Sequence, residues 1–420
     1  MKIIYNISQC VTMAGGPRRG ERLADPTILD NAAIVISDDK ILEVGNSEEL
    51  LSRYPLADHI DAAGMAVVPG LVDPHTHLVW AGDRANEFEM RLQGKTYMEI
   101  MAAGGGILAT LTATRKASLE ELVAQSLERA LCAFSYGTTT MEAKTGYGLD
   151  LENEFKQLEA ILLLNRIGPL EVVPTYMGAH AIPQEYEGNA AAYTDWLCET
   201  ALPETKKWWL EHAPDQNLPF VDVFCEKGVF ELEDTRRILV KAAHLGFPLK
   251  LHVDEFENLG GASLAAELGA ISADHLVKTS LEDIQNLSQS ETVAVSLPGT
   301  PFGLAQSEYT PARAIIEADG YLALATDLNP GTTWNESMQF IQALSCRYLK
   351  LTPAEALAAS TINSAKAISR DHLLGSIEPG KQADLLILNV DDYRKLSYRY
   401  GTNLVATVVK KGQFYPNLSL

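Results

Sequence analysis

Two histidines lie two positions apart in the run PGLVDPHTHL, which covers residues 69–78. Alternate side chains of an extended segment point to the same side, so His75 and His77 face together while Thr76 faces away. Zinc and iron ions are commonly bound by imidazole nitrogens together with carboxylates. The spacing therefore predicts part of a metal site that other segments must complete.

Further candidate ligands follow short apolar runs elsewhere in the chain. His252 and His275 close two predicted strands, Asp327 follows a third and His180 follows a fourth. In a parallel barrel the carboxyl ends of the strands converge on one face, so His77 and His252 would meet although they are distant in sequence. A single histidine at a strand end is more often a hydrogen-bonded structural residue, but this whole set favours a mononuclear Zn²⁺ or iron centre. The predicted ligands are His75, His77, His252 and Asp327.

The elements that must position these residues alternate between strand-like and helical patterns. Helices are expected at 119–134, where Ser118 and Glu121 form a capping box, and from Thr352, an N-cap followed by Pro353. Alternation of this kind around eight strands predicts a (β/α)₈ barrel of the TIM type. The strands are expected at 71–73, 138–143, 171–176, 221–225, 248–253, 272–275, 292–297 and 322–326.

The two ends of the chain have a different sequence pattern from the middle part, with short strand-like runs bounded by turn residues. Two β-rich ends around an α/β middle suggest one small β domain built from both. The terminal strands are expected at 2–6, 32–37, 40–45, 383–388 and 405–409. The remaining histidines, which are expected in helices or linkers without a metal role, are His59, His212, His244 and His372.

Composition excludes several classes of protein. The 420 residues are 46% hydrophobic and 21% charged, as in a globular protein. A net charge of −21 disfavours binding to nucleic acids or to anionic membranes. Five scattered cysteines form neither a disulfide framework nor a structural zinc motif, and they fit a reducing compartment. With neither a leader-like apolar segment nor a membrane-length apolar run in the sequence, we expect a cytoplasmic protein.

Several motifs resemble those of a known family. Residues 69–78 and 376–385 resemble the first-strand motif of the amidohydrolase superfamily and its return into a β-sandwich. More narrowly, the chain resembles the imidazolonepropionase family of histidine degradation along nearly its whole length. Where that family commonly carries Val and Ser, this chain has Ala143 and Thr145, which are small changes. The narrower matches lie at residues 80–88, 94–97 through 103–107, 142–149, 179–181, 252–255 and 326–332.

This resemblance implies a fold, a reaction and a set of contacts. The fold is a barrel at residues 67–372 with a composite β-sandwich domain formed by residues 1–66 and 373–420. The reaction is hydrolysis of 4-imidazolone-5-propanoate to N-formimidoyl-L-glutamate, with one Zn²⁺ or iron ion per chain and a homodimer expected. The implied substrate contacts are Arg84, Tyr147, His180, Glu255, Asn329, Gly331 and Thr332.

The residues also suit this chemistry by themselves. Ring opening of a cyclic amide needs an activated water and a proton for the leaving nitrogen. Asp327 or His275 can take the proton of the water and Glu255 can deliver one, while His275 can alternatively hold the carbonyl oxygen. The catalytic prediction is therefore Glu255, His275 and Asp327, with their division of roles left open. Arg84 can hold a carboxylate with two parallel hydrogen bonds, although a salt bridge to a nearby glutamate is its ordinary alternative.

Two other functions compete with this interpretation. A nucleobase deaminase of the same superfamily, of the cytosine or guanine type, would share the one-metal ligand set and the glutamate three residues after His252. A non-catalytic oligomeric scaffold would keep the fold but lose metal ligands, and here all of them are present. The glycine run at Gly104–Gly106 lacks the residues of a phosphate-binding loop, and we expect it to cover the site.

Overall fold

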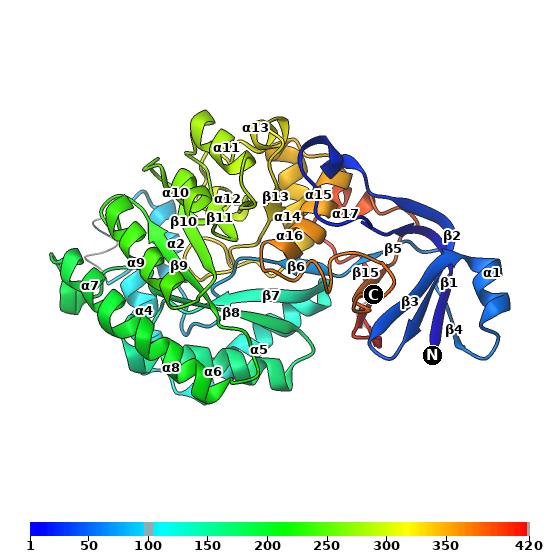
Figure 1. The fold of residues 1–420 in the computed structure, drawn as a ribbon, viewed down its shortest axis with the longest axis horizontal. Coiled ribbons are helices and arrows are strands. Elements are labelled where there is room, and N and C mark those ends of the chain that lie inside the picture. Colours follow the sequence, from blue (N-terminus) through cyan, green and yellow to red (C-terminus); the bar gives the residue numbers. More distant parts are fainter. Residues whose placement is uncertain (96–98, 100–103, 418–420) are drawn as a thin grey trace.

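The computed structural model describes residues 1–95, 99 and 104–417, which form two separate sheets with helices (Figure 1). Two of the family segments noted above extend beyond this part of the chain, because Thr96, Tyr97 and Ala103 lie outside the described residues. Among the residues described, the search for a helix both long enough and apolar enough to cross a membrane found none.

The larger assembly is an eight-stranded parallel barrel, as predicted. Each strand pairs in parallel with the next one along the chain. The first and last strands approach each other just beyond their ends, where a parallel bridge joins Thr76 to Leu328 and the amide of Asp327 donates to the carbonyl of His75. The barrel is therefore nearly closed, and its carboxyl ends share one face. Its strands are β6 (Leu71–Asp73), β7 (Thr138–Lys144), β8 (Glu171–Ala179), β9 (Phe220–Cys225), β10 (Leu249–Val253), β11 (Ser272–His275), β12 (Val293–Ser296) and β13 (Leu322–Leu324).

Helices cover the outside of these strands (Figure 1). The capping boxes expected at Ser118 and Glu121, and at Thr352 and Glu355, are both present. These caps satisfy backbone N–H groups that a helix start leaves unpaired. The barrel helices are α2 (Ala85–Leu92), α4 (Ile107–Lys116), α5 (Leu119–Ser135), α6 (Leu151–Ile167), α7 (Ala190–Trp196), α8 (Leu202–His212), α9 (Leu232–His244), α10 (Gly261–Leu268), α11 (Leu281–Ser288), α12 (Gly299–Gly303), α13 (Ala312–Glu317), α14 (Met338–Leu344), α15 (Pro353–Ala359) and α16 (Ile362–Lys366).

The two ends of the chain meet in a second eight-stranded sheet, at the end of the molecule away from α7, α8 and α9 (Figure 1). Antiparallel pairing of β14 with β5 joins the C-terminal strands to the N-terminal ones. One prediction was wrong here, because His59 lies in a strand of this sheet, not in a helix or linker. Its elements are β1 (Lys2–Val11), β2 (Ile28–Ser37), β3 (Lys40–Asn46), β4 (Asp58–Asp61), β5 (Val67–Pro69), β14 (Leu385–Leu388), β15 (Val405–Lys410) and β16 (Gln413–Pro416), with helices α1 (Ser47–Arg53) and α17 (Lys395–Tyr398).

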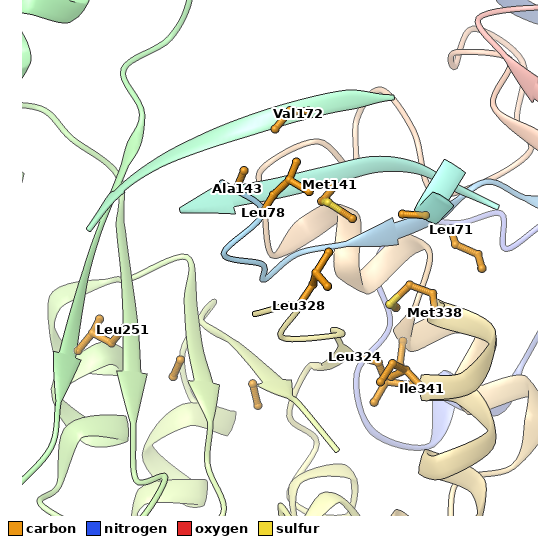
Figure 2. Packing of buried hydrophobic residues seen from close by; sticks show 14 of the residues in the cluster. Leu71, Leu78, Met141, Ala143, Val172, Leu251, Leu324, Leu328, Met338 and Ile341 are labelled. Carbon is orange, nitrogen blue, oxygen red and sulfur yellow. The ribbon is translucent and has the colours of Figure 1, made fainter. Parts of the chain in front are cut away.

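The barrel strands are buried on both faces. Leu71, Met141 and Leu324 belong to one hydrophobic cluster with Met338 and Ile341 of α14 (Figure 2). Removal of such side chains from water is the main favourable term in folding. Parallel strands buried in this way consist mostly of apolar residues. Charged residues within them therefore need partners that offset the cost of burying a charge.

Candidate active site

The four predicted metal ligands lie together at the carboxyl ends of the barrel strands. His75 and His77 follow β6, His252 lies in β10, and Asp327 follows β13. The Nε2 atoms of His77 and His252 are 3.4 Å apart. Oδ1 of Asp327 lies 3.6 Å from Nε2 of His75 and 3.8 Å from Nε2 of His77. Parallel strand order thus brings together residues that are far apart in sequence.

These residues fit a metal ion. Nε2 of His75 is buried and has no hydrogen-bond partner among the described residues, which is costly unless another ligand takes its lone pair. The ligand atoms of His75, His77 and Asp327 lie within 4.8 Å of one another, and so do those of His75, His252 and His275. Imidazole nitrogens with a carboxylate oxygen match the preferences of zinc and of iron.

Two buried aspartates orient the ligand imidazoles. Nδ1 of His75 lies 2.7 Å from Oδ2 of Asp274, and Nδ1 of His252 lies 3.0 Å from Oδ2 of Asp222. With the proton on Nδ1 and shared with a carboxylate, Nε2 is left free to face the centre. Burial, and next the charge of Lys144, hold the pKa of His75 well below its ordinary value. The imidazole is therefore neutral, as a metal ligand must be.

Both aspartates belong to a cluster of charged residues inside the barrel, which our sequence analysis missed. Nζ of Lys144 lies 2.6 Å from Glu142 and 2.7 Å from Asp222. Burial alone lowers the pKa of a lysine, but the carboxylates of Asp222, Glu142 and Asp274 outweigh it and raise the pKa of Lys144 above its ordinary value. The available signal was the presence of charged residues within strands that are otherwise apolar.

A cavity of about 740 Å³ opens beside the histidine cluster. The ring of His180 stacks on that of His77, with centroids 4.7 Å apart, and Nδ1 of His180 lies 3.0 Å from the carbonyl oxygen of Gly146. Burial lowers the pKa of His180 to about 3, so this imidazole is neutral. The cavity has room for a small molecule and is lined by the candidate metal ligands His77, His252 and Asp327. All the predicted substrate contacts line it: Arg84, Tyr147, His180, Glu255, Asn329, Gly331 and Thr332.

Glu255 and His275 form a pair on the cavity wall. Oε2 of Glu255 lies 3.7 Å from Nε2 of His275, and both side chains are buried. Burial, together with the nearby carboxylates of Asp327 and Glu226, holds the pKa of Glu255 well above its ordinary value. A raised pKa favours the protonated form, which can act as an acid.

Arg84 lines the cavity and forms the ion pair that was considered as its ordinary alternative. Its Nε and Nη2 atoms donate to Glu87 at 2.8 and 2.5 Å. Glu87, which lies on α2, also accepts from the amide of Gly106 at 2.8 Å. The far side of the guanidinium lies against Gly331, where an added Cβ would clash with Nη1 of Arg84. Glu87 thus fixes one edge of the guanidinium and leaves the edge beside Gly331 for a ligand.

Asn329 organises the loop that follows Asp327. Its Nδ2 donates to the carbonyl of Asp327 at 2.7 Å, and its Oδ1 accepts from the amides of Gly331 and Thr332 at 2.8 and 2.9 Å. This loop therefore connects a candidate metal ligand to the wall that faces Arg84.

Comparison with known proteins places this geometry in a family. Residues 232–414 match the amidohydrolase family. The chain is 52% identical to an imidazolonepropionase of Herpetosiphon aurantiacus, over 98% of this chain and 96% of that protein. It is 49% identical to an imidazolonepropionase of Symbiobacterium thermophilum, with the same coverage of both chains. The chain belongs to the imidazolonepropionase family.

Solved structures with the same fold are more distant than these relatives. An adenosine deaminase from Xanthomonas campestris with bound zinc superimposes with a TM-score of 0.73 at 18% identity, over 98% of this chain and 92% of that one. A 5-methylcytosine deaminase from Klebsiella pneumoniae gives a TM-score of 0.72 at 16% identity, over 100% of this chain and 98% of that one. At such identities the likeness shows the fold alone, whereas the imidazolonepropionase relatives show the family.

The first prediction concerns the metal. Purified protein should contain about one zinc or iron ion per chain, because the imidazoles and the carboxylate provide one ligand set. His77→Ala should lose most of this metal, whereas His244→Ala, which removes an exposed histidine of α9, should keep it. Elemental analysis of the three proteins measures the effect. Equal metal content in wild type and His77→Ala would exclude His77 as a ligand.

Proposed function

We propose that this protein hydrolyses the ring amide of 4-imidazolone-5-propanoate and releases N-formimidoyl-L-glutamate. One observation carries the proposal: a histidine and aspartate cluster fit for a metal, a buried carboxyl group and an arginine all line a single cavity. The resemblance of the full chain to imidazolonepropionases supports the same reaction. Water adds to the carbonyl carbon, the ring C–N bond breaks, and the leaving nitrogen takes a proton.

In this proposal one zinc or iron ion per chain is held by His75, His77, His252 and Asp327. Such an ion lowers the pKa of a water molecule and polarises a carbonyl group. The unpartnered Nε2 of His75 and the Nδ1 contacts of His75 and His252 support this ligand set. Zinc and iron both accept it.

The protein's own groups handle the protons. Asp327 and His275 both line the cavity, and either can take the proton of the attacking water. Burial raises the pKa of Asp327 to about 6 in the metal-free protein, and a bound cation would lower it by stabilising the carboxylate form. Glu255 is suited to protonate the leaving nitrogen, because burial raises the pKa of its carboxyl group and so favours the protonated form. His275 can also donate a hydrogen bond to the carbonyl oxygen as it gains charge.

The remaining contacts select the substrate. Arg84 presents the edge of its guanidinium that Glu87 leaves free, and a carboxylate can accept two parallel hydrogen bonds from it. Tyr147 and His180 lie beside His77 with ring centroids 5.7 and 4.7 Å from it, close enough to pack against an imidazolone ring. Asn329, Gly331 and Thr332 complete the wall.

We also expect a homodimer located in the cytoplasm. The five cysteines are all unpaired, which supports a reducing compartment. A deaminase function remains the alternative within the superfamily, but the relatives that share about half of the sequence are imidazolonepropionases. A non-catalytic scaffold is disfavoured, since the complete ligand set is retained.

The direct test is turnover. Metal-loaded protein mixed with freshly prepared 4-imidazolone-5-propanoate should cause loss of the imidazolone absorbance and release no ammonia. Cytosine and guanine serve as comparison substrates, and neither should be consumed. Release of ammonia from a nucleobase, with imidazolone propanoate unchanged, would favour the deaminase instead.

Glu255→Gln should keep its metal but lose turnover by roughly a hundred- to ten-thousandfold, because an amide cannot deliver a proton. Glu355→Gln is a matched control, since Glu355 is also buried and accepts from the backbone amide of Thr352 at 2.7 Å but lies outside the cavity. The control should retain most of its activity. Values of kcat and metal content are measured for both variants, and an unchanged kcat for Glu255→Gln would remove Glu255 from the reaction.

Arg84→Ala should lower kcat/KM for imidazolone propanoate by roughly ten- to a hundredfold, the usual cost of losing a charge-assisted hydrogen bond. An imidazolone without the propanoate tail should be affected far less. Arg313→Ala removes an arginine that is also paired with a glutamate, Glu355, but lies outside the cavity, and it should affect neither substrate. Equal losses on both substrates in Arg84→Ala would mean that Arg84 shapes the loop without recognising the carboxylate.

A further inference from the structure

Lys144 lies at the end of β7, beneath the histidine cluster, with its side chain fully buried. Its Nζ lies 2.6 Å from Oε1 of Glu142, 2.7 Å from Oδ2 of Asp222 and 3.9 Å from Oδ2 of Asp274. The three carboxylates come from three different strands, β7, β9 and β11. One ammonium group therefore joins separate parts of the barrel interior.

Two of these carboxylates contact the imidazole of a proposed metal ligand. Asp222 accepts from both the backbone amide and Nδ1 of His252, at 3.1 and 3.0 Å. Asp274 lies 2.7 Å from Nδ1 of His75. Because Oδ2 of Asp222 is shared between Nζ of Lys144 and Nδ1 of His252, the ammonium directly constrains the group that orients this imidazole.

The third carboxylate holds the segment between His75 and His77. Oε2 of Glu142 accepts from the backbone amide of Thr76 at 3.0 Å, and the hydroxyl of Thr76 donates to the carbonyl of Glu142 at 2.6 Å. The backbone amide of Lys144 itself donates to the carbonyl of Thr76 at 2.9 Å. Three hydrogen bonds thus join Thr76 to Glu142 and Lys144 of β7, and they fix the backbone between His75 and His77.

We propose that Lys144 is a positioning residue for the metal centre, acting through Glu142, Asp222 and Asp274 on three histidine ligands at once; this inference rests on the metal site of the proposed function. Its role is to hold the carboxylates where they meet Nδ1 of His75, Nδ1 of His252 and the amide of Thr76. Mutation of residues that hydrogen-bond to metal ligands typically weakens metal affinity by about ten- to a hundredfold.

The charge balance explains why this position needs a cation. Lys250 is the second buried lysine of the cluster, and its Nζ lies 3.5 Å from Asp274 and 2.6 Å from the hydroxyl of Ser272. Without Lys144, Glu142 and Asp222 would lose their shared counter-ion, since among the described residues Lys250 forms an ion pair with Asp274 but not with Glu142 or Asp222. Buried carboxylates without a counter-ion repel one another and move apart or draw in water. The imidazoles that depend on them would then lose their fixed orientation.

Lys144→Met is the test, because methionine fills a similar volume without charge. The zinc dissociation constant of the full-length protein is measured by competition with a chelator, and we expect it to rise about ten- to a hundredfold. Lys410→Met is the matched control, since Lys410 is also buried and lies 2.8 Å from Asp384 and 3.4 Å from Glu171, but on the terminal sheet. The control should lower the thermal midpoint and leave zinc affinity at the wild-type value.

A merely structural role would give a different pattern, in which both variants lose stability and neither loses zinc affinity; that result would overturn the proposal. If Lys144→Met does not fold, Lys144→Met with Glu142→Gln removes one charge of each sign, and its zinc affinity is compared with that of Glu142→Gln alone. A weaker affinity of the double variant supports the role of Lys144, and equal affinities contradict it. Wild-type protein that binds zinc but leaves imidazolone propanoate unchanged would contradict the proposed function alone.

Discussion

A buried imidazole can present Nε2 to a metal only if its Nδ1–H has an acceptor, and much of this barrel interior follows from that requirement. Carboxylates are the best acceptors, and Asp222 contacts Nδ1 of His252 while Asp274 contacts Nδ1 of His75. Carboxylates buried among strands need cations in turn, and Lys144 and Lys250 provide them. The apolar core stabilises the barrel, while this polar interior contacts Nδ1 of the candidate ligands His75 and His252.

The overall charge of the protein makes local cations necessary for an anionic substrate. At −21 the molecule as a whole repels a carboxylate, and the pair of Arg84 with Glu87 is neutral. Arg91 adds a positive charge to the same wall, where its Nη2 donates to the carbonyl of Gly331 at 3.0 Å. Glu87 thus orients the guanidinium of Arg84 and cancels its charge, and Arg91 leaves one net positive charge among these three residues.

Residues that follow strand ends were predictable from the sequence, and those that orient them were not. His75, His77, His252 and Asp327 could be grouped because parallel strands direct their carboxyl ends to one face. Asp222 and Asp274 gave no such signal, since an acidic residue inside a strand does not reveal its partner. The ion pair of Arg84 was foreseen only as one of two alternatives, because the choice depends on how α2 packs. His59 was wrongly predicted to lie in a helix or linker. The strand that contains it, β4, has only four residues and is stabilised by pairing with β1, which is not visible in the local sequence.

The loop after Asp327 links the two ends of the proposed substrate. Asn329 holds the carbonyl of Asp327 with its amide nitrogen and the amides of Gly331 and Thr332 with its amide oxygen. Gly331 in turn lies against Arg84 and accepts from Arg91. Because Asn329 connects Asp327 to the wall that faces Arg84, the proposed substrate pose would have a fixed distance between the reacting amide and the carboxylate. A tail shorter or longer than propanoate would reach only one of these ends in a productive position, since catalysis depends on both being in place together. In the proposed function, selection of the substrate by its length would therefore depend on the same loop that follows the candidate ligand Asp327.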